Sequence, residues 1–368
     1  MNIWKVIGPG ILFAGSAIGV SHLVQSTRAG AQWGLGLVLV LVLANLIKYP
    51  AFLFGPLYAA ATGHSLLDGY RRQGRWALVL FALMTVGTMF TVEAAVAVVT
   101  AGLAKVTFGW EASPQVIAVA LVGTCAGILA AGRFRWLDRV IKVTVALLTV
   151  TTLFATVLVL PRVEWGSFGW LPRDLDLAGL LFIAAFVGWM PSAIDISVWH
   201  SIWSVERRRD TGYAPKRREA RIDFDIGYIG TAVMGLCFLV MGAGVFYSSG
   251  QTLQPQPAAF AHQVIDLYAE TLGAWSRPVI ALSAFSVMFS TTLAVVDAFP
   301  RVLATLWARF QGAATMASEP RGPYWVSMAL VAAGAFWILF FHLTGLASLV
   351  DLATTISFLT APVLAILN

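Results

Sequence analysis

A small set of ionisable side chains interrupts long apolar stretches of this sequence, and these side chains are the ones best suited to chemistry. They are His22, Lys48, Glu93, Asp195, His200, Asp297 and Asp351. A charged side chain at the centre of a membrane-spanning helix costs at least about 2.5 kcal/mol. Each of these residues is therefore a candidate for binding an ion, transferring a proton or closing a gate.

Three side chains offer ligands to a metal ion, namely His22, Met190 and Asp195. Imidazole and thioether ligands favour transition metals, whereas a carboxylate suits harder cations such as Mg²⁺ and Mn²⁺. The histidine could instead carry a proton, because imidazole titrates near neutral pH. Each residue also has a structural interpretation, since a buried histidine can be hydrogen-bonded, a methionine can fill the core and an aspartate can pair with a basic residue.

Two further residues are candidates for binding or releasing a proton or another small cation. Glu93 lies near the middle of its apolar segment, where a carboxyl group can bind and release a proton, and we predict a role in proton coupling. A buried ammonium must pair with a carboxylate or lose its proton. We therefore predict that Lys48 pairs with Glu93 or Asp195, or that its charge takes the place of a coupling cation.

The remaining ionisable residues lie near the ends of apolar segments. Asp297 and Arg301 are four residues apart, so a helix would place them on one face as an ion pair or as part of a gate. Asp351 is interpreted as a gate or as a solvated helix end. His64 and His200 are expected near the cytoplasmic boundary, in contact with solvent.

The composition indicates which elements must position these residues. The chain is 59% hydrophobic and only 11% charged, whereas soluble domains contain roughly a quarter charged residues. Its apolar runs are long and continuous, as spanning helices require, and lack the short alternation of a membrane barrel. Cys125 and Cys237 each lie within an apolar run, which excludes a disulfide framework or a cysteine-based metal site. We predict an all-α integral membrane protein.

The sequence contains ten hydrophobic segments, joined by short polar connections except at 204–222 and 249–275. Their approximate spans are 6–30, 34–61, 76–105, 115–132, 140–161, 178–203, 224–248, 277–308, 324–343 and 346–367. With the N-terminus in the cytoplasm, 18 of the 24 lysines and arginines fall on the inner side. Because positive loops stay inside, we predict a multi-pass protein of the cell (inner) membrane with a cytoplasmic N-terminus.

Several function classes are excluded by what the sequence lacks or by where its charges lie. The arginine run at 204–221 fits orientation and anionic lipid, so the basic charge needs no nucleic acid. No Walker A motif is present, which argues against ATP-driven transport. No His-Glu-x-x-His or Gly-x-Ser-x-Gly motif supports a membrane enzyme.

Two of the ten segments combine glycine, proline and polar residues near their middles, and both are expected to be broken. The first runs from Gly8 to His22, and the second from Gly188 to Asp195. Each opens a five-segment half, 1–161 and 178–368, which is the pattern of an inverted-repeat transporter with its site at the breaks. The predicted binding residues are Gly19, Ser21, His22, Trp189, Met190, Ser192 and Asp195.

The same segments carry a family resemblance. Gly8-Pro9-Gly10 followed by Ala29-Gly30-Ala31, together with Met190-Pro191 and Ala61-Thr62-Gly63, resembles the Nramp divalent-metal transporters. The resemblance implies a LeuT-like fold with two inverted five-helix repeats, broken helices 1 and 6, and an eleventh helix expected beyond Asn368. It also implies an acidic proton-path residue in helix 3, a role that Glu93 would take.

The sequence departs from that family at the metal site. The metal-binding Asp-Pro-Gly-Asn falls on Gly19-Val20-Ser21-His22, so the aspartate is absent and a histidine stands at the asparagine position. The helix-6 methionine is retained as Met190, while the following motif histidine is Ser192. The pattern is that of a divergent, Nramp-related branch.

We therefore predict a secondary active transporter, not an enzyme, that carries divalent metal cations by alternating access with proton coupling and needs no cofactor. The alternative is a transporter of a small organic solute such as an amino acid. The run from Gly15 to Gly19 resembles the glycine-rich break of amino-acid transporters, where free N–H groups bind a carboxylate. A non-transporting sensor or scaffold is a third interpretation, which the lack of a sizeable soluble domain disfavours.

Overall fold

The computed structural model describes residues 8–131, 134–172, 175–312, 321–342 and 346–368, without the side chains of 134–145, 210, 321 and 346. Within these ranges the regular structure is helical, without strands. The main helices are α2 (Pro9–Ala17), η1 (Ser21–Ser26), α3 (Thr27–Trp33), α4 (Val38–Thr62), α5 (Leu66–Gln73), α6 (Arg75–Phe108), α7 (Pro114–Ala130), α8 (Phe134–Val159), α9 (Leu177–Gly188), α10 (Ile196–Thr211), α11 (Arg217–Gly242), η4 (Ala243–Tyr247), α12 (Pro257–Leu272), α13 (Ser276–Phe310), α14 (Arg321–Phe341) and α15 (Leu346–Leu367). Two short 3₁₀ turns, η2 (Leu160–Arg162) and η3 (Trp165–Ser167), follow α8.

All ten predicted hydrophobic segments are helical over the residues that the structure describes, which leave out 6–7, 132 and 343, and the two expected to be broken are broken. Segment 1 divides into α2 and a second half made of η1 and α3, and segment 6 divides into α9 and α10. Six of the described helices are long and apolar enough to cross a membrane, by length and composition: α4, α6, α11 with η4, α13, α14 and α15. The broken helices are too short to qualify as single spans.

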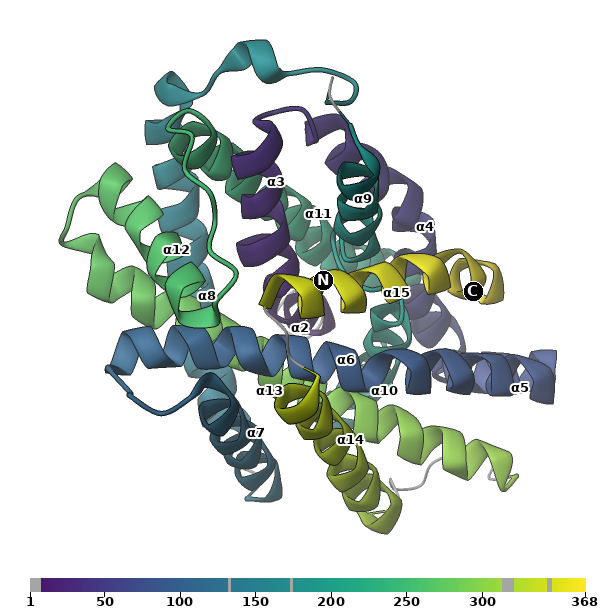
Figure 1. Ribbon diagram of the computed structural model, residues 1–368. Coiled ribbons are helices and arrows are strands. Elements are labelled where there is room, and N and C mark those ends of the chain that lie inside the picture. The colour runs from purple at the N-terminus through teal and green to yellow at the C-terminus, as the bar shows by residue number, and fades with distance from the viewer. Residues whose placement is uncertain (1–7, 132–133, 173–174, 313–320, 343–345) are drawn as a thin grey trace.

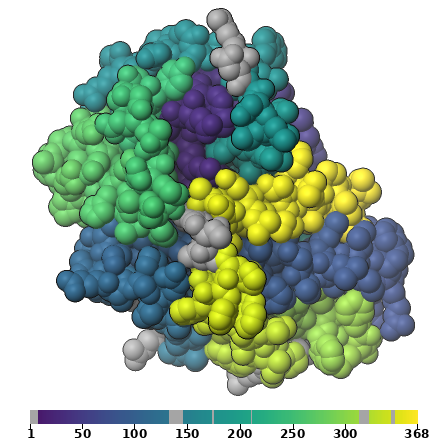
Figure 2. Space-filling view, in the orientation of Figure 1, coloured from purple at the N-terminus to yellow at the C-terminus, as the bar shows by residue number. Residues whose placement is uncertain are grey.

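The unbroken helices surround the two broken ones. Figure 1 shows α6 running across the molecule with α15 alongside, and α6 also packs against α13. We call the broken helix of segment 1 helix 1; its halves are α2 and the η1–α3 pair. On its other side, α11 contacts both of these halves, and α10 packs against α4. In the space-filling view the purple residues of helix 1 lie in a hollow between the teal of α9 and the green of the α12 region (Figure 2).

Two helices outside the ten segments were not predicted from the sequence. The first is α5, which begins with a capping box between Ser65 and Asp68 and is tied to α13 by an Arg309–Asp68 ion pair of 2.6 Å. The second is α12, which lies in the 249–275 connection and packs on α6, α8 and α13. Both have too few apolar residues in a row to resemble a spanning segment.

Glycine pairs hold both halves of helix 1 close to α11. A Cβ at Gly10 would lie 2.0 Å from the carbonyl oxygen of Asp223, and one at Gly227 would lie 2.2 Å from that of Gly10. In the other half, a Cβ at Gly30 would lie 1.9 Å from the carbonyl oxygen of Leu239. Small residues let helix backbones approach closely in a membrane, so these pairs set the position of helix 1.

Candidate functional site

The break in helix 1 is short and is pressed against α13. The last helical residue of α2 is Ala17. The next two residues, Ile18 and Gly19, are not helical, and the chain becomes helical again at Val20. A Cβ at Gly19 would lie 2.8 Å from the hydroxyl oxygen of Thr291 on α13. This close approach explains why a glycine occupies the position at which the Nramp pattern has an aspartate.

The break in helix 6 is longer and is held by its neighbours. Residues 189–195 separate α9 from α10, and the Met190–Pro191 peptide bond is cis. A Cβ on Gly188, the last residue of α9, would lie 2.0 Å from the carbonyl oxygen of Thr354 on α15. The indole Nε1 of Trp189 donates a hydrogen bond of 2.8 Å to the hydroxyl of Ser357.

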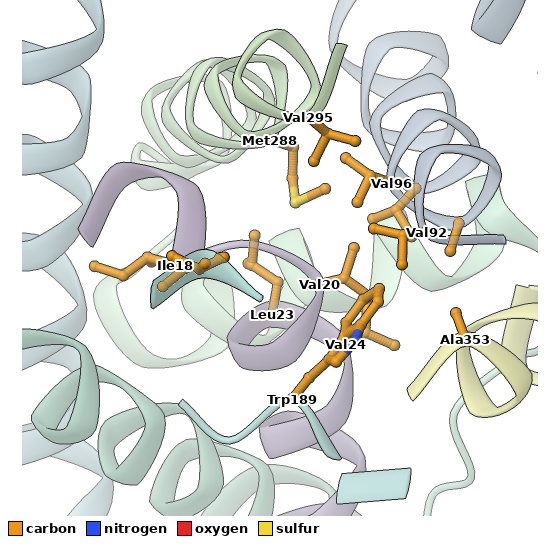
Figure 3. Packing of buried hydrophobic residues seen from close by; sticks show 14 of the residues in the cluster. Ile18, Val20, Leu23, Val24, Val92, Val96, Trp189, Met288, Val295 and Ala353 are labelled. Atoms are coloured by element: carbon orange, nitrogen blue, oxygen red, sulfur yellow. The ribbon is translucent and has the colours of Figure 1, made fainter. Parts of the chain in front are cut away.

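A small cavity lies between the two breaks, and we call it the central cavity. It encloses about 30 Å³, room for about two water molecules. Its lining comes from both broken helices, α6 and α13: Ser16, Ala17, Val20, Ser21, Val92, Val96, Trp189, Ser192, Ala193, Asp195, Ile196, Trp199, Thr291 and Val295. Figure 3 shows its apolar side, where Val92 and Val96 of α6 and Val295 of α13 gather near Val20 and Trp189.

Three of the four hydroxyl groups that line the central cavity give their protons to the protein, and the fourth belongs to Ser192. Ser16 donates to the carbonyl of Leu12 at 2.9 Å, and Thr291 donates to that of Gly15 at 3.2 Å. The Ser21 hydroxyl lies 2.8 Å from the carbonyl of Ala17 and 2.7 Å from Nδ1 of His22. Their oxygen lone pairs, not their protons, therefore remain available to the cavity.

Asp195 supplies a carboxylate to this cavity. The residue is 8% exposed, and its Oδ1 is buried without a hydrogen-bond partner among the described residues. A buried carboxylate oxygen is costly unless something pairs with it. Together with the hydroxyl lone pairs, Asp195 makes the side-chain environment one of oxygen acceptors, which is the chemistry that suits a cation.

His22 and Met190, which we predicted as metal ligands, lie together behind the cavity wall. His22 donates from Nε2 to the Thr231 carbonyl at 2.8 Å, because a carbonyl only accepts, and its Nδ1 contacts Ser21. A Cβ built on Gly235 of α11 would lie 3.1 Å from the Met190 sulfur and 3.5 Å from the His22 ring. Neither side chain lines the cavity with Asp195, and the described residues hold no cluster of three His, Cys, Asp or Glu side chains suited to a metal.

The predicted ion pair of Lys48 with Glu93 or Asp195 is wrong. Its ammonium donates to the carbonyl of Gly188 at 2.9 Å and to that of Val187. The break leaves the last carbonyls of α9 without helical donors, and a positive charge is favoured at a helix C-terminus. The broken helix thus explains the partner of Lys48, while its predicted role in ion coupling stays a prediction.

Two other buried residues lie away from the central cavity. Glu93 is 2% exposed and is not among the residues that line the central cavity. Its proton-coupling role stays a prediction. The expectation that His200 is solvated is wrong, because it is 1% exposed and its ring packs against Phe13 and Phe224.

Ion pairs lie at both ends of the broken helices. The predicted intrahelical pair of Asp297 with Arg301 is present at 2.9 Å, and Arg301 also pairs with Glu206 of α10. Its gating role stays a prediction. At the other end, Arg28 of helix 1 forms an ion pair of 2.7 Å with Asp351 of α15.

Sequence reasoning found only part of the cavity lining. Ser21, Trp189, Ser192 and Asp195 line it as predicted positions, and Gly19 lies beside it against Thr291. The hydroxyls of Ser16 and Thr291 were missed. Hydroxyl residues in otherwise apolar helices were the available signal, and in Thr291 that signal falls within the run Ser290-Thr291-Thr292.

A cavity between two discontinuous helices, enclosed by unbroken ones, defines the LeuT-like class of secondary transporters. Two solved structures support this fold. One is a variant of the Eremococcus coleocola manganese transporter, with a TM-score of 0.67 and 15% identity over 99% of this chain and 78% of that one. The other is Mhp1, a nucleobase-cation-symport-1 transporter solved in a closed conformation, with a TM-score of 0.60 and 16% identity over 94% and 75%.

Within that class the sequence comparisons identify the family. The family model for natural resistance-associated macrophage protein-like (Nramp) sequences matches residues 10–367. An uncharacterised protein of Pasteurella multocida is 35% identical over 99% of this chain and 84% of its own. The divalent metal cation transporter MntH of Levilactobacillus brevis is 22% identical over 84% and 71%. The chain belongs to the Nramp family of membrane transporters, and the predicted family and fold class are confirmed.

Proposed function

We propose that this Nramp-family transporter carries a divalent metal cation across the cell membrane by alternating access, with its N-terminus in the cytoplasm. The cargo binds in the central cavity, where Asp195 supplies the anionic ligand. The observation that carries the proposal is the buried Asp195 Oδ1, which lacks a hydrogen-bond partner among the described residues and lines a cavity of hydroxyl lone pairs.

The ligand set we propose differs from the one predicted from sequence. Asp195 comes from the helix-6 break and takes over the negative charge that Gly19 cannot supply from helix 1. Ser16, Ser21 and Thr291 add neutral oxygens, and carboxylate, hydroxyl and water oxygens are the ligands that Mg²⁺ and Mn²⁺ prefer. His22 serves as a positioning residue, because its Nδ1 contacts the Ser21 hydroxyl.

The same geometry argues against an anionic organic solute. A carboxylate needs hydrogen-bond donors, whereas three of the four hydroxyls in the lining, those of Ser16, Ser21 and Thr291, donate into the protein. The Asp195 charge would also repel an anion. In this conformation the cavity of about 30 Å³ has room for a cation with about two waters. The names of the manganese and divalent-cation transporters among its relatives agree with a metal cargo.

Alternating access requires helix 1 to separate from its neighbours at each end in turn. On one side, Arg28 makes two hydrogen bonds to Asp351, of 2.7 and 3.0 Å. On the other side, the carboxylate of Asp223 accepts from the backbone N–H groups of Gly8 and Gly10, at 3.0 and 2.7 Å. A carboxylate is favoured at a helix N-terminus, so it holds α2 against α11. These contacts are the proposed outer and inner gates.

Calorimetry and flux measurements on purified protein test the cargo. We expect saturable Mn²⁺ binding by isothermal titration and Mn²⁺ uptake into proteoliposomes, with no heat from a pool of amino acids. The absence of Mn²⁺ heat at millimolar concentration, from protein that elutes as a single species, would overturn the proposed cargo. A pH dye in the same vesicles tests coupling, and unchanged proton movement in Glu93→Gln would exclude the predicted role of Glu93.

Weakening the outer gate should expose the cavity to the outside. In a protein with Ala193→Cys in the cavity wall, Asp351→Asn should raise the labelling rate by a membrane-impermeant thiol reagent about fivefold. That factor corresponds to about 1 kcal/mol for a partly exposed ion pair. Asp266→Asn, which breaks the Arg277–Asp266 pair between α12 and α13, is the matched control and should change nothing. Equal labelling in both variants would exclude this gate.

A further inference from the structure

A second, smaller cavity lies beside the central one, and the two share Ala193 and Asp195 of the helix-6 break in their linings. It encloses about 10 Å³ between α6, the break and α15, enough for one particle the size of a water molecule. Asp195 lines both cavities. Met84 and Leu364 line the small one toward the start of α6 and the end of α15, which is the predicted cytoplasmic side.

Four hydroxyl groups converge on this cavity from two helices. Thr85 and Thr88 on α6, like Ser357 and Thr360 on α15, are three residues apart and therefore share a helix face. Each donates its proton to a backbone carbonyl of its own helix, at distances between 2.9 and 3.2 Å. Their remaining lone pairs are thus left for whatever occupies the space between them, and Ser357 keeps one because its hydroxyl also accepts from the Trp189 indole.

We propose that this small cavity is a second cation site, and that it binds a dehydrated monovalent ion of the size of Na⁺. Four hydroxyl oxygens and the Asp195 carboxylate form an all-oxygen set, and the buried Oδ1 of Asp195 lacks a partner among the described side chains and backbone groups. Hard cations take such ligands. A divalent ion gives up its water far more reluctantly, and this space leaves no room for the water it would keep.

Sharing one carboxylate links the two sites. Two cations that share the Asp195 carboxylate repel each other and compete for the same negative charge. Binding of Na⁺ should therefore lower the affinity of the central cavity for a divalent ion. By linkage, the divalent ion must lower the affinity for Na⁺ by the same factor. The existence of the Na⁺ site is independent of the cargo, whereas this competition rests on the proposed function.

Radioactive ²²Na⁺ binding to the purified protein in lipid nanodiscs, with choline as the replacing cation, tests the site. The wild type should bind Na⁺ saturably. Thr88→Val combined with Thr360→Val, which exchanges two hydroxyls for methyl groups, should weaken Na⁺ binding at least tenfold. The Mn²⁺ affinity, measured in choline buffer, should stay within twofold. Replacing both residues with serine keeps the oxygens and should restore Na⁺ binding.

Thr305→Val is the matched control, because Thr305 is also buried and donates to a carbonyl of its own helix, α13, away from both cavities. It should leave Na⁺ binding unchanged. Absence of Na⁺ binding by the wild type, or wild-type Na⁺ binding by the double valine variant, would overturn the second site. Equal losses of Na⁺ and Mn²⁺ binding would show that no separate site exists. Na⁺ binding without Mn²⁺ binding would overturn the proposed cargo instead.

Discussion

Asp195→Asn is expected to lower the affinity for Mn²⁺ at least about 100-fold while leaving the protein as stable as the wild type or more so. The carboxylate is the single negative charge in the lining of the central cavity, and a 100-fold loss corresponds to about 2.7 kcal/mol. Asparagine keeps the size of the side chain. It removes a buried charge that has an oxygen without a partner among the described residues. The free energy of desolvating that charge no longer destabilises the ligand-free protein.

Titration calorimetry with Mn²⁺ and a thermal melt of the same preparation measure the two effects separately. Asp225→Asn is the control, since Asp225 pairs with Arg221 on the surface of α11 and lies outside the cavity. It should keep the wild-type affinity within twofold. Wild-type Mn²⁺ binding by Asp195→Asn would remove this residue from the proposed site, and a large fall in melting temperature would assign it a structural role.

The helical segments could be predicted from the sequence because they depend on a property that acts locally. A spanning helix needs a run of apolar residues, whereas the orientation inferred from the loop charges stays a prediction. The breaks were also predictable, because glycine and proline in the run from Gly188 to Pro191 would lower the stability of a continuous helix. Counting along the chain from that break placed Asp195 near the cavity, where the structure has it.

The direction of side chains after a break could not be predicted in the same way. Residues Ser21–Ser26 form a π-helix, in which i→i+5 hydrogen bonds replace the regular spacing. The 3.6-residue period therefore does not apply to this segment, and His22 faces the Thr231 carbonyl of α11 instead of the cavity. Nothing in the residue types distinguishes that arrangement from a ring directed at a ligand.

Partners far apart in the chain were also out of reach. Arg28 and Asp351 are separated by 323 positions, and each alone resembles a charge at a solvated helix end. Lys48 was expected to pair with a carboxylate, because a sequence shows only which side chains are available as partners. Its actual partners are the backbone carbonyls of Val187 and Gly188. Those carbonyls are free to accept a hydrogen bond only because α9 ends there. The partner of Lys48 could therefore be identified only from the exact position of the break.

Gly30→Ala is expected to abolish the recovery of folded protein. The new Cβ would lie 1.9 Å from the carbonyl oxygen of Leu239 and 2.7 Å from the backbone nitrogen of Ala243. Both are backbone atoms, so no side-chain rotation can relieve the overlap, and α3 must move away from α11. Helices in a membrane associate through close packing rather than the hydrophobic effect, and we expect a cost of at least about 3 kcal/mol.

The loss of packing at Gly30 would also affect other contacts of this interface, because glycines on both helices take part in it. Gly242 of α11 packs against the Thr27 carbonyl in the same interface, where its own Cβ would lie 2.3 Å away. Gly87→Ala is the matched control, since Gly87 lies within α6 with nothing within 4 Å of a new Cβ, and alanine favours a helix. Fluorescence-detected size exclusion and a thermal melt compare the two variants. A Gly30→Ala protein that elutes and melts like Gly87→Ala would show that helix 1 does not depend on this contact, and its position beside the cavity would then need another cause.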